Sequence, residues 1–144
     1  MIKTCFFSYL NIKQDMGINY KSDTFFDNIM FNLKISLIKN HRPRTNPYEP
    51  DFYIDTVEGR IYIEVKKIGS GLNKNQCRWF FENKDKDLYI LYLEILSHGN
   101  CKKAFNVFDP RDCELIDRLI FLRNKGLLLN QHFGNINKWL EVKK

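Results

Sequence analysis

Residues 51–68, DFYIDTVEGRIYIEVKKI, contain two extended segments separated by the dipeptide Glu58-Gly59. The segments, 51–57 and 60–68, are rich in β-branched and aromatic residues, a composition typical of strands. The Glu-Gly pair between them is typical of a tight turn, although it is a weaker turn signal than Asn-Gly. The sequence therefore predicts a β-hairpin, and the rest of the fold is expected to form around it.

A two-residue loop at this turn predicts the register of the hairpin. It places Tyr53 opposite Glu64 and Asp51 opposite Lys66. Opposed residues share a face of a sheet, and side chains alternate faces along each strand. One predicted face is polar and contains Asp51, Tyr53, Asp55, Tyr62, Glu64 and Lys66. The other is apolar and contains Phe52, Ile54, Ile61, Ile63 and Val65. A slip of one residue would mix the two sets, so this segregation favours the predicted faces.

The polar face carries residues suited to metal-dependent hydrolysis. Asp51 and Glu64 become diagonal neighbours, with Cβ atoms about 7–8 Å apart or slightly less. Two carboxylates at that separation can share one Mg²⁺, at about 2.1 Å per oxygen. Lys66 lies one pleat beyond Glu64, roughly 7 Å along the strand, where its ammonium can stabilise charge on a phosphate or orient the attacking water. The backbone carbonyl of Val65 is expected to be an additional ligand.

The alternative interpretation is an ordinary solvated, charged face, on which acidic and basic neighbours are common. An apolar segment at 88–96 and the flanking helices argue against it, because they predict that both faces of the sheet are covered. A half-buried pair of acids needs a cation. The sequence therefore favours a metal site over a solvated face.

Apolar spacing, capping residues and proline breaks predict the remaining elements. These are a strand or helix start over 3–12, a helix from Ser22 or Asp23 to about Asn40, a helix over 73–83, a buried strand over 88–96, and a helix from Asp109-Pro110 to Gly126. The order of helix, hairpin, helix, strand and helix predicts an α/β (mixed α+β) fold with a central mixed sheet flanked by helices. With 144 residues, the chain fits one domain over 1–144.

Composition limits the class of protein. The net charge of +6 suits a polyanionic partner such as DNA. No apolar run is long enough to span a bilayer, and no cleavage pattern follows the short apolar stretch at the N-terminus. An intracellular protein is expected, in the cytoplasm or, for a viral protein, in the host cytoplasm. The four cysteines, which lack a C-x-x-C pair, are expected to be small, partly buried thiols; they are Cys5, Cys77, Cys101 and Cys113.

Pro50-Asp51 followed by Glu64-Val65-Lys66 resembles the signature of the PD-(D/E)xK nuclease superfamily. The resemblance covers about residues 23–96 and is carried by YEPDF at 48–52, IYIEVK at 61–66 and QCRW at 76–79. The first two stretches are similar to the second and third core strands of that superfamily. The third is similar to a helix of resolvase-like and VRR-type members in which a glutamine lies near the metal.

The resemblance implies a restriction-endonuclease-like core over 23–96, with a helical part over 109–144. It implies a metal-dependent deoxyribonuclease that uses Mg²⁺, with Mn²⁺ able to substitute. Asp51, Glu64 and the Val65 carbonyl would bind the metal, Lys66 would assist at the water or phosphate, and Gln76 would help to position them. The basic residues expected to contact phosphates are Arg42, Arg44, Lys67, Lys74 and Arg78.

The sequence departs from this superfamily at one position. Such nucleases often carry a glutamate on the preceding helix, aimed at the same metal, but residues 22–40 contain no glutamate. The acids available there are Asp23 and Asp27. Asp27 lies one turn into the helix and is the better candidate for a third ligand, although it equally fits a solvated first-turn acid. Glu49 is the other alternative.

The small size resembles stand-alone Holliday-junction resolvases, which act as dimers, so a junction substrate and a homodimer are expected. Flap, single-strand or end-directed cleavage is the alternative within the same class. A different class, a non-catalytic nucleic-acid-binding protein with a nuclease-like fold, also fits the sequence. Metal-dependent nicking distinguishes an enzyme from a binding protein, and alanine in place of Asp51 or Glu64 is expected to abolish cleavage and leave the fold intact.

Overall fold

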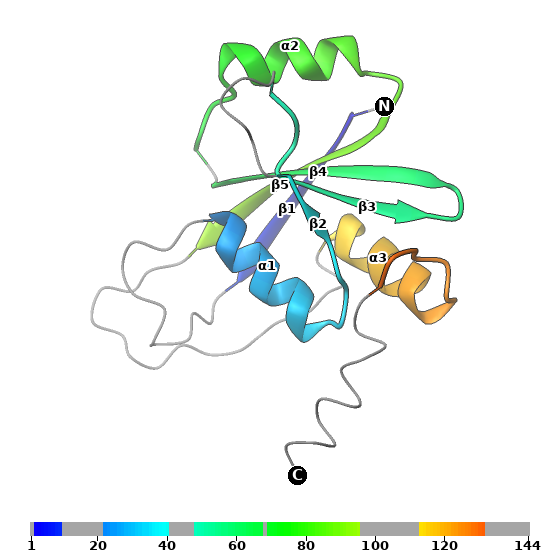
Figure 1. Ribbon diagram of the computed structural model, residues 1–144. Helices are drawn as coiled ribbons and strands as arrows, with labels where there is room; N and C mark the ends of the chain where they lie inside the picture. The colour runs from blue at the N-terminus through cyan, green and yellow to red at the C-terminus, as the bar shows by residue number, and fades with distance from the viewer. Residues whose placement is uncertain (1, 10–21, 41–47, 68, 96–112, 132–144) are drawn as a thin grey trace, which may run out of the picture.

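A computed structural model describes residues 2–9, 22–40, 48–67, 69–95 and 113–131 of the protein (Figure 1). In these residues the strands are β1 (Ile2–Tyr9), β2 (Ile38–Lys39), β3 (Phe52–Thr56), β4 (Gly59–Lys67) and β5 (Asp87–Ile95). The helices are α1 (Ser22–Asn32), α2 (Lys74–Glu82) and α3 (Glu114–Asn124). The strands form one mixed sheet in the order β1-β5-β4-β3-β2, with β1, β5 and β4 parallel and β3 antiparallel to both of its neighbours. The predicted mixed α/β fold is confirmed at this level.

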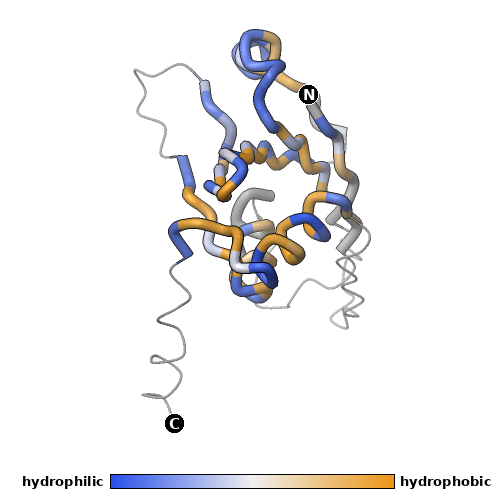
Figure 2. The backbone as a smooth tube through the Cα atoms, turned by 90° about the vertical axis from the view of Figure 1, so that its right-hand side faces the viewer, coloured by the Kyte–Doolittle hydropathy of each residue, from blue (hydrophilic) through white to orange (hydrophobic). Residues whose placement is uncertain are grey.

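Helices cover the two faces of the sheet unequally. Figure 1 shows α2 on one face and both α1 and α3 on the other. The larger core lies between the sheet and α1 and α3, and a smaller cluster lies beneath α2. Figure 2 shows hydrophobic residues along the central strands and on the helices beneath them. No helix within the described residues is long and apolar enough to cross a membrane.

The hairpin turn lies one residue earlier than predicted. Thr56 pairs with Gly59, so Val57 and Glu58 form the loop. The Thr56 hydroxyl fixes this turn, because it accepts a hydrogen bond from the Glu58 amide at 3.0 Å and donates one to the Gly59 carbonyl at 2.9 Å. Gly59 has φ +129°, a conformation that side chains rarely allow. Glycine is therefore needed where the chain enters β4.

The predicted register was wrong by two residues as a result. Tyr53 lies opposite Tyr62 rather than Glu64. When the register is continued by one pair, Asp51 lies opposite Glu64 rather than Lys66. Because an even shift preserves the faces, the predicted segregation is confirmed. The apolar face is buried in the larger core, where Phe52, Ile54, Ile61, Ile63 and Val65 are at most 6 % exposed.

The first helix, α1, ends well before the predicted Asn40. Lys34 adopts a left-handed conformation with φ +58°, and the Ile35 amide donates to the Met30 carbonyl at 2.9 Å. This closing turn satisfies the last helical carbonyls. The chain then extends into β2, which pairs with β3, so tertiary pairing replaces the helix that the apolar spacing alone favours.

The other elements agree closely with the predictions. The N-terminal segment, for which a strand and a helix start were both expected, is the strand β1. Helix α2 and strand β5 match the predicted 73–83 and 88–96 to within one residue. Helix α3 stops before Gly126, which has φ +69°. Its predicted start at Asp109-Pro110 lies outside the described residues, and that the whole chain is one domain stays a prediction.

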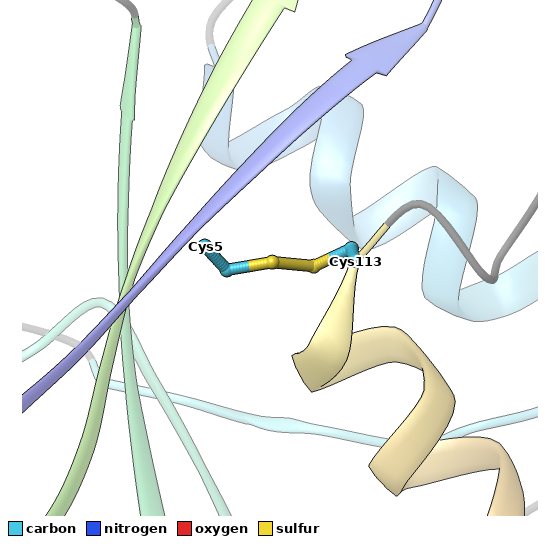
Figure 3. The surroundings of a disulfide bond; sticks show 2 residues. All are labelled: Cys5 and Cys113. Atoms are coloured by element: carbon cyan, nitrogen blue, oxygen red, sulfur yellow. A yellow bond between two sulfur atoms is a disulfide. The ribbon is translucent and has the colours of Figure 1, made fainter.

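Two of the cysteines are joined, which corrects the expectation of thiols. Cys5 in β1 and Cys113 at the start of α3 form a disulfide with a Cα–Cα distance of 5.9 Å (Figure 3). The two positions are 108 residues apart, so local spacing carries no sign of the pairing. Cys77 is a free thiol, as predicted, but it is exposed rather than partly buried. Cys101 lies outside the described residues.

Removal of the disulfide is expected to destabilise the protein. Because the bridge closes a long loop, Cys113→Ser should lower the free energy of unfolding by about 2–5 kcal/mol under oxidising conditions. Urea denaturation with and without reductant measures this. Cys77→Ser is the matched control and should unfold like the wild type. Equal stability of the Cys113→Ser and wild-type proteins without reductant would contradict a bridge that constrains the chain.

Candidate functional site

Two carboxylates meet on the face of the sheet that α2 covers. Glu64 lies in the middle of β4 and is 2 % exposed, and Asp51 directly precedes β3 and is half-buried. The Asp51 amide donates to Glu64 Oε2 at 3.2 Å, and the Val65 amide donates to Asp51 Oδ2 at 3.1 Å. Each acid therefore accepts a backbone hydrogen bond from the opposite segment. The two residues therefore lie directly opposite each other across the hairpin, whereas the predicted register made them diagonal neighbours.

Glu64 accepts two further hydrogen bonds from side chains. The Tyr48 hydroxyl donates to Oε2, and the Gln76 amide nitrogen donates to Oε1 at 3.1 Å. A buried carboxylate is tolerated only when it is paired or hydrogen-bonded, and bonds to a charged acceptor are stronger than neutral ones. Three donors, two on the segment before β3 and one on α2, therefore hold this carboxylate in one orientation.

Gln76 reaches Glu64 because the start of α2 fixes its side chain. Asn73 caps the helix. Its side-chain oxygen accepts a hydrogen bond from the backbone amide of Gln76 at 2.9 Å, and its backbone amide donates to Gln76 Oε1 at 2.9 Å. This reciprocal pair is a capping box. Since the side-chain oxygen of Gln76 is used by the cap, its NH₂ group is the end that faces Glu64. The positive end of the helix dipole therefore lies beside a buried acid.

Tyr48 is the residue of this cluster to which the sequence assigned no role. Its ring packs edge-on against Phe80 and Trp79 of α2, with centroid distances of 5.9 and 6.5 Å. A tyrosine that is buried by such packing needs a partner for its hydroxyl. The available signal was its position three residues before Asp51 in an otherwise polar segment. That position is too weak a sign to predict a contact with Glu64.

Lys66 lies on the same face as Glu64, one pleat beyond it. Its ammonium donates to the Gly71 carbonyl at 3.2 Å, which links the end of β4 to the loop before α2. In the observed register Lys66 does not lie opposite Asp51. The acid pair therefore lies across the hairpin, and the amine lies further along β4 on the same face.

The acids expected as a third ligand do not join the pair within the described residues. Asp27 is exposed on α1, which packs on the other face of the sheet, and Glu49 is also exposed. The side chain of Asp23 lies outside the described residues. In the part of the chain that is described, no group of three or more histidine, cysteine or acidic side chains is arranged to hold a metal ion. Asp27 therefore does not supply the extra ligand expected at this site, and the expectation for Asp23 stays untested.

The remaining predicted residues are one backbone carbonyl and five basic side chains. Val65 uses its amide to bind Asp51, and a metal contact of its carbonyl stays a prediction. Lys67, Lys74 and Arg78 are exposed, and Arg78 forms an ion pair with Glu82 at 3.7 Å. Arg42 and Arg44 lie outside the described residues.

The donor set fits Mg²⁺. That ion is usually held by one or two carboxylates, with water and substrate phosphate oxygens completing its shell, rather than by a full protein cage. Asp51 and Glu64 supply two oxygen donors of this type in a fixed arrangement. A third protein acid is not required for such a site.

Comparison with known proteins gives no match: no protein-family model, curated protein or solved structure matches this chain. A function must therefore be inferred from the chemistry of the residues described above.

Proposed function

We propose that the protein is a Mg²⁺-dependent deoxyribonuclease, with Mn²⁺ able to substitute. The single observation that supports this most is the hydrogen-bonded pair of Asp51 and Glu64 at the base of the hairpin. The pair is partly enclosed by α2, and Lys66 follows on the same face. Two neighbouring carboxylates with an amine on the same face are the groups that metal-assisted phosphodiester hydrolysis uses.

The electrostatics of the pair favour a cation. Hydrogen bonds offset the cost of removing Glu64 from water, but they leave two acids of like charge side by side. A divalent ion held by both would relieve this repulsion. The positive end of α2 adds only a partial charge of about half a unit. A divalent ion is therefore a chemically suitable ligand for these two neighbouring carboxylates.

Each residue has a definite task in the proposed reaction. Asp51 and Glu64 would hold the ion, while Gln76 and Tyr48 keep Glu64 correctly oriented. When bound, Mg²⁺ lowers the pKa of a coordinated water and neutralises charge on the scissile phosphate. Water attacks phosphorus and releases a proton to solvent, the bond to the leaving oxygen breaks and that oxygen takes up a proton from solvent. The Lys66 ammonium stabilises the negative charge that develops on the phosphate.

The finer parts of the proposal concern the substrate. The net charge of +6 and the exposed Lys74 and Arg78 on α2, the helix over the acid pair, suit a phosphate backbone. By resemblance to small resolvases, a Holliday junction and a homodimer are proposed. The second candidate function is non-catalytic binding of nucleic acid, which is favoured by the fact that protein donors alone already bind both oxygens of Glu64.

A cleavage assay tests the proposal. Junction, flap, single-stranded and duplex DNA are incubated with the wild type in Mg²⁺, Mn²⁺ or EDTA. The wild type should cleave only with metal, and Asp51→Asn should cleave at least about a hundredfold more slowly. The matched control is Asp117→Asn, which neutralises an exposed acid on α3 and should leave the rate unchanged.

The possible outcomes separate the two candidates. DNA binding without cleavage of any of the four substrates would establish the binding protein and contradict the enzyme. Cleavage that persists in EDTA, or full activity of Asp51→Asn, would contradict the assignment of the metal site.

A further inference from the structure

Aromatic and cationic side chains continue the polar face from the acid pair toward the hairpin turn. Tyr53 of β3 lies opposite Tyr62 of β4, with ring centroids 6.4 Å apart. Tyr62 in turn meets Trp79 of α2 at 5.2 Å. The guanidinium of Arg60 lies 3.9 Å from the centre of the Tyr53 ring. These four side chains, Arg60, Tyr53, Tyr62 and Trp79, form a continuous row that we term the aromatic ladder.

Arg60 is held in its stacked position by Asp55. The two residues are paired in the hairpin and share two hydrogen bonds, at 2.7 and 3.3 Å. The hydrogen bond to Asp55 raises the pKa of Arg60 above its already high usual range. Arg60 therefore presents a permanently charged, planar group whose side chain is 42 % exposed.

The ladder begins next to the proposed catalytic acids. Tyr53 follows Asp51 by two residues, and Tyr62 precedes Glu64 by two, so each ring lies one pleat, or about 7 Å, from an acid on the same face. A single extended nucleotide spans a step of this size. Lys66 lies on the opposite side of the acid pair. The order along the hairpin is therefore amine, acids and then stacking groups.

The chemistry of this row matches an unpaired base. Aromatic rings stack on bases without regard to sequence, and arginine planes do the same. In a continuous duplex the bases are already stacked on each other and only their edges face the grooves. Side chains of the ladder could then contact the backbone, but no base face would be available for their rings to stack on. Aromatic rings beside a phosphate site can therefore stack on bases only where the DNA strand is unpaired.

We infer that the aromatic ladder binds an unpaired base of single-stranded DNA, next to the phosphate that lies at Asp51 and Glu64. This inference rests on the proposed function for the position of that phosphate, but the binding itself does not require cleavage. It defines the substrate class as DNA with a single-stranded segment at the cut, as in a flap or an unwound junction arm.

Packing alone accounts for only part of the ladder. Trp79 and Tyr62 belong to the cluster beneath α2, where their edge-to-face contact supports the helix. Tyr53 and Arg60 are not members of either core cluster. An exposed cation–π pair adds only about 0.5–1 kcal/mol of stability. The outer half of the ladder is therefore the part that is free to serve binding.

The test compares two labelled single strands of equal length in EDTA, one of thymidylate and one of abasic residues. Fluorescence anisotropy gives each Kd for the full-length protein. The wild type should bind the thymidylate strand about tenfold more tightly than the abasic strand, a ratio within the range for stacking of one base. Tyr53→Ala should lose this preference and keep its affinity for the abasic strand, while Tyr53→Phe should retain both.

The matched control is a second exposed cation–aromatic pair, on the other side of the sheet. Lys125 lies 5.9 Å from the ring of Phe121 on α3, and Phe121→Ala should leave both Kd values unchanged. Thermal unfolding verifies that Tyr53→Ala is folded, and Arg60→Gln provides a second variant with a smaller change in packing.

Two results would overturn the inference. One is equal affinity of the wild type for the two strands. The other is an equal loss of affinity for both strands in Tyr53→Ala, which would indicate contact with the backbone only. Because these measurements are made without metal, a protein that shows the preference but does not cleave contradicts the proposed nuclease and not the ladder. A protein that cleaves without the preference contradicts the ladder alone.

Discussion

Glu64→Gln is expected to lower the rate of Mg²⁺-dependent DNA cleavage about 10³-fold, because metal-assisted charge stabilisation contributes several kcal/mol to such reactions. The substitution keeps the shape of the side chain and removes its charge. The new amide oxygen can accept from Gln76, and the hydroxyl of Tyr48 can turn to accept from the new NH₂ group, while the Asp51 backbone amide loses its acceptor. The fold should therefore survive, and single-turnover cleavage measures the loss.

Glu64→Ala differs from this conservative change, because the structure predicts a cost in stability that the sequence-based expectation of an intact fold did not include. Alanine removes the buried carboxylate that accepts hydrogen bonds from the Tyr48 hydroxyl and the Gln76 side-chain amide. Loss of the partner of a buried polar group costs about 1–3 kcal/mol. Urea denaturation should show Glu64→Ala to be a few kcal/mol less stable than Glu64→Gln. Equal stability of the two variants would contradict the buried network, and cleavage by Glu64→Gln at the wild-type rate would contradict the catalytic role.

Lys66→Met is expected to lower the rate constant for cleavage about 10²-fold without changing the dependence on Mg²⁺ concentration. Methionine keeps much of the apolar stem and removes the ammonium. Loss of one group that stabilises transition-state charge costs a factor of about 10²–10³ in comparable sites. Titration of Mg²⁺ under single-turnover conditions separates the rate constant from metal affinity.

Lys67→Met is the matched control for Lys66. The adjacent side chain is exposed and alternates to the other face of the strand, so its loss should weaken DNA binding at most and leave the rate at saturation unchanged. If Lys66→Met cleaves like the wild type, the ammonium serves only to hold the Gly71 carbonyl, and its role in the reaction is refuted.

The sequence predicted the faces of the hairpin better than its register. Alternation of apolar and polar residues has a period of two, so any even shift buries the same residues, such as Phe52 and Ile63. The choice between even shifts depends on the turn. There the Thr56 hydroxyl and the positive φ of Gly59 decide, and neither is visible in hydrophobic patterning.

Contacts between distant segments were the least predictable part of the site. Asp51 and Glu64 were expected to lie together because both belong to one hairpin, and the resemblance suggested a place for Gln76 nearby. The contact of Tyr48 with Glu64 depends on how α2 packs, and the bridge between Cys5 and Cys113 depends on the whole fold. The early end of α1 likewise follows from the pairing of β2 with β3.

Binding of Mn²⁺, followed by electron paramagnetic resonance, tests the metal site most directly. The wild type is titrated with and without single-stranded DNA, alongside Asp51→Asn, Glu64→Gln and the control Asp117→Asn. We expect the wild type and the control to bind Mn²⁺ in a form that Mg²⁺ displaces, and both site variants to lose it. Binding that is unchanged in the two site variants, or no binding by the wild type even with DNA present, would contradict a metal centre at Asp51 and Glu64.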